Sequence, residues 1–172
     1  AKTKLLSEHK HDVPLMSCVF TPNGRHLLAG GRDAAIVCLD VASGKKTALT
    51  GHESWVGDMA RTGDNLVLTS DYVGGVIAWD CSGELPSLCW KIAAHPGTIR
   101  ALAVNADGGT FATGDRDGSV RLWQCSDGKM LREFPANEHP IYGLALHPDG
   151  KHIVIADRQP KTPTIQLWDI VN

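Results

Sequence analysis

The sequence predicts an all-β fold made of four similar units, each with about four short antiparallel strands. Short apolar runs that alternate with polar residues recur along the 172 residues, glycine-containing turns separate them, and no segment shows a useful length of helical periodicity. A tryptophan, or a leucine in the first unit, stands near the end of the same run at positions 39, 79, 123 and 168. A spacing of 40 to 45 residues between equivalent positions predicts a repeat architecture.

The elements of each unit follow one order, which the third unit shows most clearly. An opening histidine, His95, precedes the alternating strand "IRALAV" (99–104), and the turn "NADGG" leads to a strand of small residues, "TFATGD" (110–115). The polar turn "RDG" (116–118) joins this strand to the tryptophan-containing strand "SVRLWQ" (119–124). In the first and fourth units the first turn contains Pro-Asn-Gly and Pro-Asp-Gly, which suits a type I turn closed by a glycine at positive φ.

Length and composition favour one domain with a well-buried core. The net charge of −2 predicts no electrostatic attraction to nucleic acid or to anionic lipid. No apolar stretch approaches the roughly 18 residues of a membrane-spanning helix, and the first twelve residues lack the apolar centre of a signal peptide. The five cysteines form no CxxC pair, so we interpret them as reduced core residues and expect a cytoplasmic protein.

The repeats resemble those of the WD-repeat family over essentially the whole chain. Gly-His near the start and Trp-Asp near the end of a repeat are the motifs of that family. Here the first motif appears as "KH" (10–11), "GH" (51–52) and "AH" (94–95), and the second as "LD" (39–40), "WD" (79–80), "WQ" (123–124) and "WD" (168–169). The resemblance implies a β-propeller with four blades of four antiparallel strands. We expect a single propeller domain, with blades at about 8–50, 51–94, 95–136 and 137–172.

The resemblance also implies a hydrogen-bonded network that joins the opening histidine, a second-strand hydroxyl, a turn aspartate and the tryptophan. In the third unit we assign His95, Asp117 and Trp123 to this structural network, with Asp115 at the position where a hydroxyl is usual. The other units depart from the pattern. The first has Leu39 in place of tryptophan, the second has Val73 at the expected aspartate position, and the fourth offers either Asn137 or His139 at the histidine position.

These structural roles remove the most obvious candidates for catalysis. We expect His11, His52, His95 and His139 to be structural, so no metal site, cofactor or catalytic residue is predicted. The histidine pair at 9 and 11 lacks a nearby cysteine or carboxylate at ligand spacing. "GDRDG" (114–118) lacks the glutamate that an EF-hand calcium loop requires.

The ends of the chain raise a question of closure. The last unit stops after three strands, and residues 2–7, "KTKLLS", lie where a fourth strand would precede the first repeat. We expect this segment to close the last blade of its own chain or of a second copy, because a propeller leaves no free edge. A homodimer that completes an eight-blade ring, a four-blade monomer and a fragment of a longer chain all remain open.

The function has to be sought in the surface loops. Two sets of loops converge on one rim of the propeller in this family, and they carry Arg32, Trp55, Tyr72, Arg116 and Arg158. Arginine, tyrosine and tryptophan are the residues that dominate binding energy at protein interfaces. We therefore predict a non-catalytic scaffold or adaptor that binds a protein or peptide at this rim, with an acidic or phosphorylated ligand preferred.

An enzyme or small-ligand-binding propeller is the alternative. It would use groups on the first strand of each blade, which line the central channel of a propeller. Asp58, Arg61 and Arg100 are the ionisable candidates there.

Overall fold

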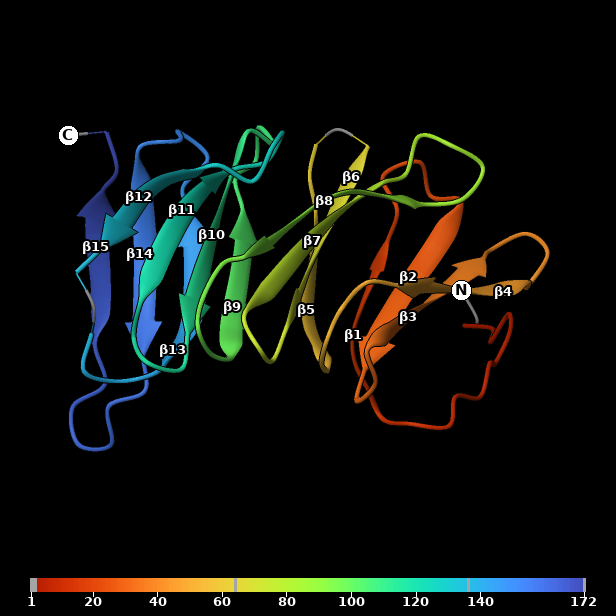
Figure 1. Cartoon of the computed structure of the whole chain (residues 1–172), viewed down its shortest axis with the longest axis horizontal. Helices are drawn as coiled ribbons and strands as arrows, with labels where there is room; N and C mark the ends of the chain where they lie inside the picture. Colours follow the sequence, from red (N-terminus) through yellow and green to blue (C-terminus); the bar gives the residue numbers. More distant parts are fainter. Residues whose placement is uncertain (1–2, 64, 136, 172) are drawn as a thin grey trace.

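The computed structural model describes residues 3–63, 65–135 and 137–171, which form fifteen strands in four antiparallel sheets (Figure 1). The first sheet contains β1 (Leu15–Phe20), β2 (His26–Gly31), β3 (Ala35–Asp40) and β4 (Lys46–Thr50). The second contains β5 (Val56–Arg61), β6 (Leu66–Asp71), β7 (Gly75–Asp80) and β8 (Ser87–Ala93). The third contains β9 (Ile99–Val104), β10 (Thr110–Asp115), β11 (Val120–Gln124) and β12 (Met130–Phe134). The fourth has β13 (Ile141–Leu146), β14 (His152–Asp157) and β15 (Ile165–Asp169).

The sheets stand side by side as four blades, from the red and orange first blade to the blue fourth blade in Figure 1. Each sheet is a meander in which consecutive strands pair, and the first strand of each blade contacts the first strand of the next. This is the all-β, blade-by-blade architecture that the sequence predicts, and no helix occurs in the described ranges. Accordingly, none of the described residues belongs to a helix long and apolar enough to cross a membrane.

The core lies between the blades rather than inside any one of them. Leu28 and Ile36 of the first blade pack with Val56 and Val67 of the second, and similar buried clusters join the second blade to the third and the third to the fourth. Gly114 in β10 shows how closely the blades approach. A Cβ atom there would lie 2.5 Å from Cγ2 of Ile141 in the next blade, so a larger residue would push the blades apart.

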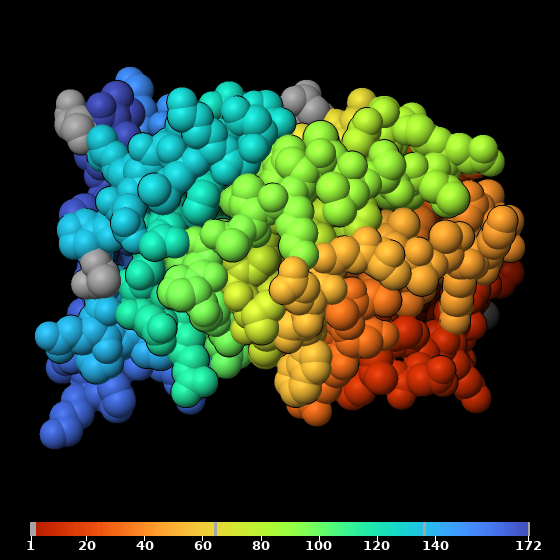
Figure 2. Space-filling model, viewed as in Figure 1, coloured from red at the N-terminus to blue at the C-terminus, as the bar shows by residue number. Residues whose placement is uncertain are grey.

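The two ends of the arc carry exposed apolar surface. Strand β15 is the edge of a three-stranded sheet, and its Ile165 and Leu167 are exposed. Residues 3–7 form no strand; together with residues 8–11 they lie beside the first blade, where Lys46 donates a hydrogen bond to the carbonyl of Lys10. Figure 2 shows this red segment against the orange blade. Within the chain, residues 3–7 therefore do not pair with β15, and residue 2 lies outside the described residues. Pairing with a second copy stays a prediction.

Candidate functional site

Two blades contain a complete histidine network that fixes the loops above them. In the second blade, His52 contacts Asp71 through Nδ1 at 2.8 Å and Oγ1 of Thr69 through Nε2 at 2.7 Å. Trp79 donates its indole N–H to the same hydroxyl at 2.9 Å. All four side chains are buried. Because each polar group finds a partner, the network anchors the loop before β5 to the turn after β6.

The third blade repeats this arrangement with His95, Asp115, Thr113 and Trp123. The His95 ring lies 3.1 Å from Asp115 and 2.7 Å from the Thr113 hydroxyl, which also accepts the Trp123 indole N–H at 2.8 Å. Burial, together with the charge of Arg121, lowers the pKa of His95 despite the opposing effect of Asp115. The ring is therefore neutral at neutral pH.

Two sequence predictions about this network are wrong. Asp117 is exposed and lies outside it, and its backbone N–H donates to Oδ1 of Asp115. The second blade, predicted to lack the aspartate because of Val73, has it at Asp71. The aspartate stands at the end of the second strand, two residues before the expected position. There one carboxylate oxygen accepts two N–H groups of the turn while the other faces the histidine.

The outer blades use other networks. In the fourth blade Trp168 donates its indole N–H to Gln166, whose amide donates to Asn137. Asn137 donates its backbone N–H to Gly118, as His95 does to Gly74, so Asn137 rather than His139 takes the histidine position. In the first blade His11 lies 3.4 Å from Asp33.

Each blade joins its two rim loops by the same backbone hydrogen bond. The residue after the second strand donates its N–H to the carbonyl of the residue immediately before the first strand. The four pairs are Arg32 to Pro14, Tyr72 to Trp55, Arg116 to Thr98 and Arg158 to Pro140, with distances of 2.9 to 3.0 Å. These are the two loop sets that the sequence placed on one rim. In Figure 1 the rim is the lower edge of the molecule, where the blue loop between β14 and β15 projects.

Along this rim, arginines and aromatic rings form a continuous row across all four blades, which we call the rim ladder. Its members in order are Arg32, Trp55, Tyr72, Arg100, Tyr142 and Arg158. Arginine guanidinium carbons lie 5.0 to 5.8 Å from the centroids of the neighbouring rings, and the Trp55 and Tyr72 centroids are 5.7 Å apart. These distances lie within the range of cation–π attraction.

The structure places the five predicted rim residues as follows. Arg32, Trp55, Tyr72 and Arg158 are members of the ladder, and all except the half-buried Tyr72 are exposed. Arg116 is exposed. The pKa of Tyr142 is lowered mainly by its hydrogen bond from Arg158, and the positive charges of Arg100 and Arg116 lower it further. Among the described residues, no ion pair joins Arg32, Arg116 or Arg158 to a carboxylate. The rim therefore presents positive charge that nearby aspartates do not neutralise.

Sequence reasoning missed Tyr142 and gave Arg100 a different role, and a β-bulge explains both. In every blade the second residue of the first strand has no partner on the second strand, and these residues are Met16, Gly57, Arg100 and Tyr142. A bulge turns a side chain away from the regular alternation of a strand. It places Arg100 and Tyr142 on the ladder, and the bare Gly57 leaves room for the Tyr72 ring, whose Cε1 lies 2.6 Å from where a Cβ would be.

A cavity of about 220 Å³ opens beside Arg100, between the rings of Tyr72 and Tyr142. Arg100 donates to the Tyr72 hydroxyl at 3.4 Å, whereas its buried Nε has no partner among the described residues. Asp58 lies in the same cavity. Burial raises the pKa of its carboxyl group, although the N–H groups of Met59 and Leu102 donate to it and oppose that shift. The cavity thus offers an unused guanidinium donor flanked by two aromatic rings.

Comparison with known proteins agrees with the repeat motifs. The family model described as "WD domain, G-beta repeat" matches residues 2–40, 86–124 and 128–169. The chain belongs to the WD-repeat family. The structure is also similar to the crystal structure of the computationally designed Ika4 protein, with a TM-score of 0.80, 22% sequence identity and 99% of each chain covered.

Curated WD-repeat relatives are longer than this chain. Nuclear distribution protein nudF of Aspergillus niger is 29% identical over 151 residues, which cover 86% of this chain and 28% of that protein. The guanine nucleotide-binding protein subunit beta of Oryza sativa subsp. japonica is 26% identical over 173 residues, covering 86% of this chain and 44% of that protein. The chain therefore spans less than half the length of these relatives.

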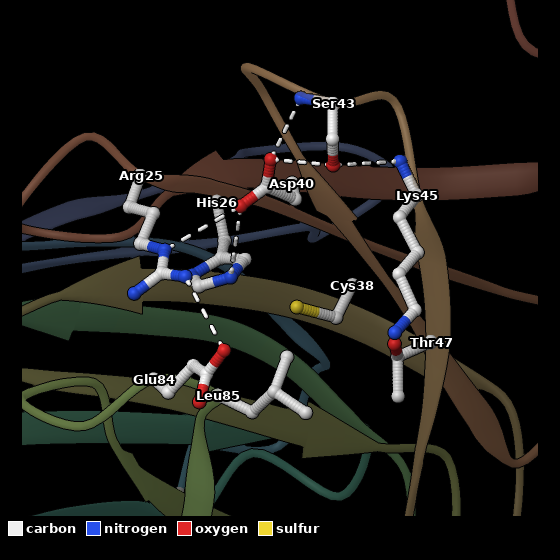
Figure 3. A pocket seen from close by; sticks show the side chains of 9 residues that line it. All are labelled: Arg25, His26, Cys38, Asp40, Ser43, Lys45, Thr47, Glu84 and Leu85. Atoms are coloured by element: carbon white, nitrogen blue, oxygen red, sulfur yellow. Dashed lines mark hydrogen bonds and ion pairs between the residues drawn. The ribbon is translucent and has the colours of Figure 1, made fainter.

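A second polar pocket in this WD-repeat chain, of about 160 Å³, lies between the first two blades (Figure 3). Several of its polar groups are engaged with one another, whereas Nε2 of the buried His26 lies 3.8 Å from Oδ2 of Asp40 and has no hydrogen-bond partner among the described residues. Both the backbone and the hydroxyl of Ser43 donate to Asp40, which lowers the pKa of that carboxyl group to about 2, and Arg25 lies 3.4 Å from it. Burial raises the pKa of the Cys38 thiol to about 11, so it is protonated and a poor nucleophile. We assign this pocket a structural role in the turn after β3.

Proposed function

We propose that this chain is a non-catalytic platform that binds a protein or peptide at the rim ladder. The observation that carries the proposal is the ladder itself, in which residues from all four blades form one row of guanidinium groups and rings, four of the six exposed and two half-buried. Arginine and aromatic side chains supply most of the energy at protein interfaces. One relative is named as a subunit of a guanine nucleotide-binding protein, which supports an interaction role.

The chemistry of the ladder favours an acidic or phosphorylated segment with an apolar anchor. Arginine binds carboxylates and phosphates through planar, charge-assisted pairs of hydrogen bonds. Arg32, Arg116 and Arg158 lack carboxylate partners among the described residues, and Arg100 has an unused Nε. Trp55, 41% exposed, offers apolar area for the anchor.

The channel-based alternative has less support. Arg100 belongs to the rim ladder, Arg61 is exposed at the end of β5, and the Asp58 carboxylate accepts two backbone N–H groups. No pairing of a nucleophile with a base involves these three residues. Because the described part of the chain contains no disulfide and three of its cysteines are buried, we propose the cytoplasm as the compartment.

We also propose that two copies close an eight-blade ring. Closure would bring the first blade of one copy beside the last blade of the other, and residues 3–7 already lie beside the first blade. The exposed edge of β15 would then receive this segment as a fourth strand.

The binding proposal is tested with fluorescein-labelled peptides and fluorescence anisotropy. The probes are a glutamate-rich peptide with a central leucine, its phosphoserine counterpart, and a lysine-rich peptide of equal length. We expect the two acidic probes to bind, more weakly as salt rises, and the lysine-rich probe not to bind. Equal binding of all three probes, or binding of none, would overturn the proposal.

A further inference from the structure

The turn between β13 and β14 combines two histidines and an aspartate, a set that the equivalent turns of the first and third blades do not combine. Its backbone is closed by two hydrogen bonds, from His147 N–H to the carbonyl of His152 and from Gly150 N–H to the carbonyl of His147. The first and third blades close the same turn with the same two bonds, at 21–26 and 105–110. The residues at the three side-chain positions differ. They are Thr21, Asn23 and His26 in the first blade, Asn105, Asp107 and Thr110 in the third, and His147, Asp149 and His152 in the fourth.

In the fourth blade these three side chains converge on one point. Nδ1 of His147 lies 2.9 Å from Oδ1 of Asp149, and Nδ1 of His152 lies 2.9 Å from Oδ2 of the same carboxylate. All three donor atoms lie within 4.8 Å of one another. The two imidazole rings stand almost perpendicular, at 88°, with centroids 5.9 Å apart. One carboxylate is therefore flanked by two ring nitrogens that face it from different directions.

The distances approach those of a metal site. A tetrahedral zinc ion bound at about 2.0–2.2 Å separates its donors by about 3.3–3.6 Å. The two imidazole nitrogens, which now face different oxygens of Asp149, would have to turn toward one of these oxygens and move back from it by about half an ångström. The N–H of Lys151 donates to Oδ1 of Asp149 and holds the carboxylate in place between the two imidazoles.

We propose that His147, Asp149 and His152 bind a divalent transition-metal ion such as Zn²⁺ through two imidazole nitrogens and one carboxylate oxygen. A fourth position faces solvent, because all three side chains are partly exposed. Imidazole is a ligand for zinc, copper and nickel, whereas calcium and magnesium require more oxygen donors than one carboxylate supplies. When the metal binds, Nδ1 of His147 gives up its long hydrogen bond of 3.2 Å from the Asp149 N–H and coordinates the metal ion instead.

This site is separate from the rim ladder. Tyr142 lies near the start of β13, whereas His147 follows the end of that strand. The metal site therefore occupies the opposite end of the fourth blade. Its presence or absence does not depend on the proposed peptide-binding function.

Isothermal titration calorimetry, in which the full, tag-free chain is titrated with ZnCl₂, tests the proposal. We expect one saturable site per chain. The variant H147T/D149N reproduces the first-blade turn, in which the hydroxyl of Thr21 donates to Asn23 at 2.8 Å. It should therefore keep the fold, as circular dichroism would check, while zinc affinity falls at least tenfold. His152→Ala should weaken binding similarly, and His9→Ala, which changes an exposed histidine elsewhere, should not.

X-ray absorption at the zinc edge identifies the donors directly. The expected spectrum of the wild-type complex shows two imidazole ligands and otherwise oxygen ligands. The proposal is overturned if no saturable binding is found, if H147T/D149N binds zinc as wild type does, or if the spectrum shows sulfur ligands from the exposed Cys18 or Cys89.

Discussion

The guanidinium carbon of Arg100 lies 5.0 Å from the ring centroid of Tyr72 and 5.8 Å from that of Tyr142. Arg100 thereby connects the second, third and fourth blades at the rim. Because the ladder is continuous, a ligand bound at one blade is in reach of groups from its neighbours. Binding and stability can then be separated by substitutions at particular members of the ladder.

Arg100→Met should abolish most binding of the acidic probes while changing stability little. The substitution removes cation–π contacts worth about 0.5–2 kcal/mol, and it also removes a buried Nε without a partner, which costs about 1–3 kcal/mol. These effects oppose each other. We expect at least tenfold weaker binding by anisotropy and a melting temperature within a few degrees of wild type. Unchanged affinity would exclude Arg100 from the site.

Charge reversal at Arg116 tests the electrostatic part of the proposal. Arg116→Glu should weaken binding of the phosphoserine probe about tenfold and reduce its dependence on salt. Lys129→Glu is the matched control, because it makes the same change of charge in the turn at the other end of β11. Equal losses in the two variants would indicate a general effect of net charge rather than a site at the rim.

Gly57→Ala should disrupt the ladder through sterics alone. The added Cβ would lie 2.6 Å from Cε1 of Tyr72, so the ring must leave its place against Arg100. We expect a loss of about 1–3 kcal/mol in the free energy of unfolding and weaker binding of the acidic probes. At Gly83 the nearest atom to an added Cβ is 3.6 Å away, so Gly83→Ala should preserve binding. If the Gly57→Ala variant binds the acidic probes as tightly as wild type does, the position of the Tyr72 ring is not required for binding.

The histidine network of the third blade should contribute to the free energy of unfolding, and its members should contribute cooperatively because they share hydrogen-bond partners. Thr113→Val removes the hydroxyl that donates to Nε2 of His95 and accepts the indole N–H of Trp123, and it should cost about 1–3 kcal/mol. Trp123→Ala should cost about 3–5 kcal/mol. Urea unfolding measures both. The double variant His95→Ala/Asp115→Ala should lose less unfolding free energy than the sum of the losses in the two single variants. Asp117→Ala should change the stability by under about 0.5 kcal/mol, and a loss comparable to that of Asp115→Ala would contradict the assignment.

Stability should fall on mild acidification because of His95. Its folded-state pKa is lowered from 6.5, mainly by burial, so below about pH 6.5 the unfolded chain binds the proton more readily. The lowered pKa of Asp71 adds a second loss below about pH 4. Free energies of unfolding at pH 7.5 and 5.5 measure the first effect. His95→Gln should reduce this difference, and an undiminished difference would assign it to another group.

Ring closure predicts a molar mass of two chains in solution. Deletion of residues 2–7 should expose the β15 edge and cause dissociation or aggregation, measured by light scattering. The same mass and the same stability after deletion would refute closure by this segment.

The repeat unit was predictable because its cues are local. Turn glycines, alternating strands and the Trp-Asp motifs recur at one spacing, and each blade then buries its faces against the next. The position of the network aspartate was not predictable from the sequence. The turn contains aspartates at both 115 and 117, and only the strand register shows that Asp115 is the one that faces His95.

The rim was partly predictable for a similar reason. Arg32, Trp55, Tyr72, Arg116 and Arg158 lie in loops whose positions follow from the blade order. Tyr142 lies inside a strand, where regular alternation does not reveal that a bulge redirects its side chain. The ligand cluster on the β13–β14 turn was also overlooked, since Pro-Asp-Gly was interpreted only as turn chemistry and His152 lies in the following strand.

The bulges give this architecture a practical property. Met16, Arg100 and Tyr142 have no cross-strand partner and belong to none of the three interblade cores. Their identity is therefore largely free of the constraints that specify the blades, whereas position 57 is coupled to the residue chosen at 72. Under the proposed rim function, substitutions at these positions would change ligand specificity while the scaffold persists. A combinatorial library varied at 16, 100 and 142 would sample new recognition surfaces on an unchanged framework.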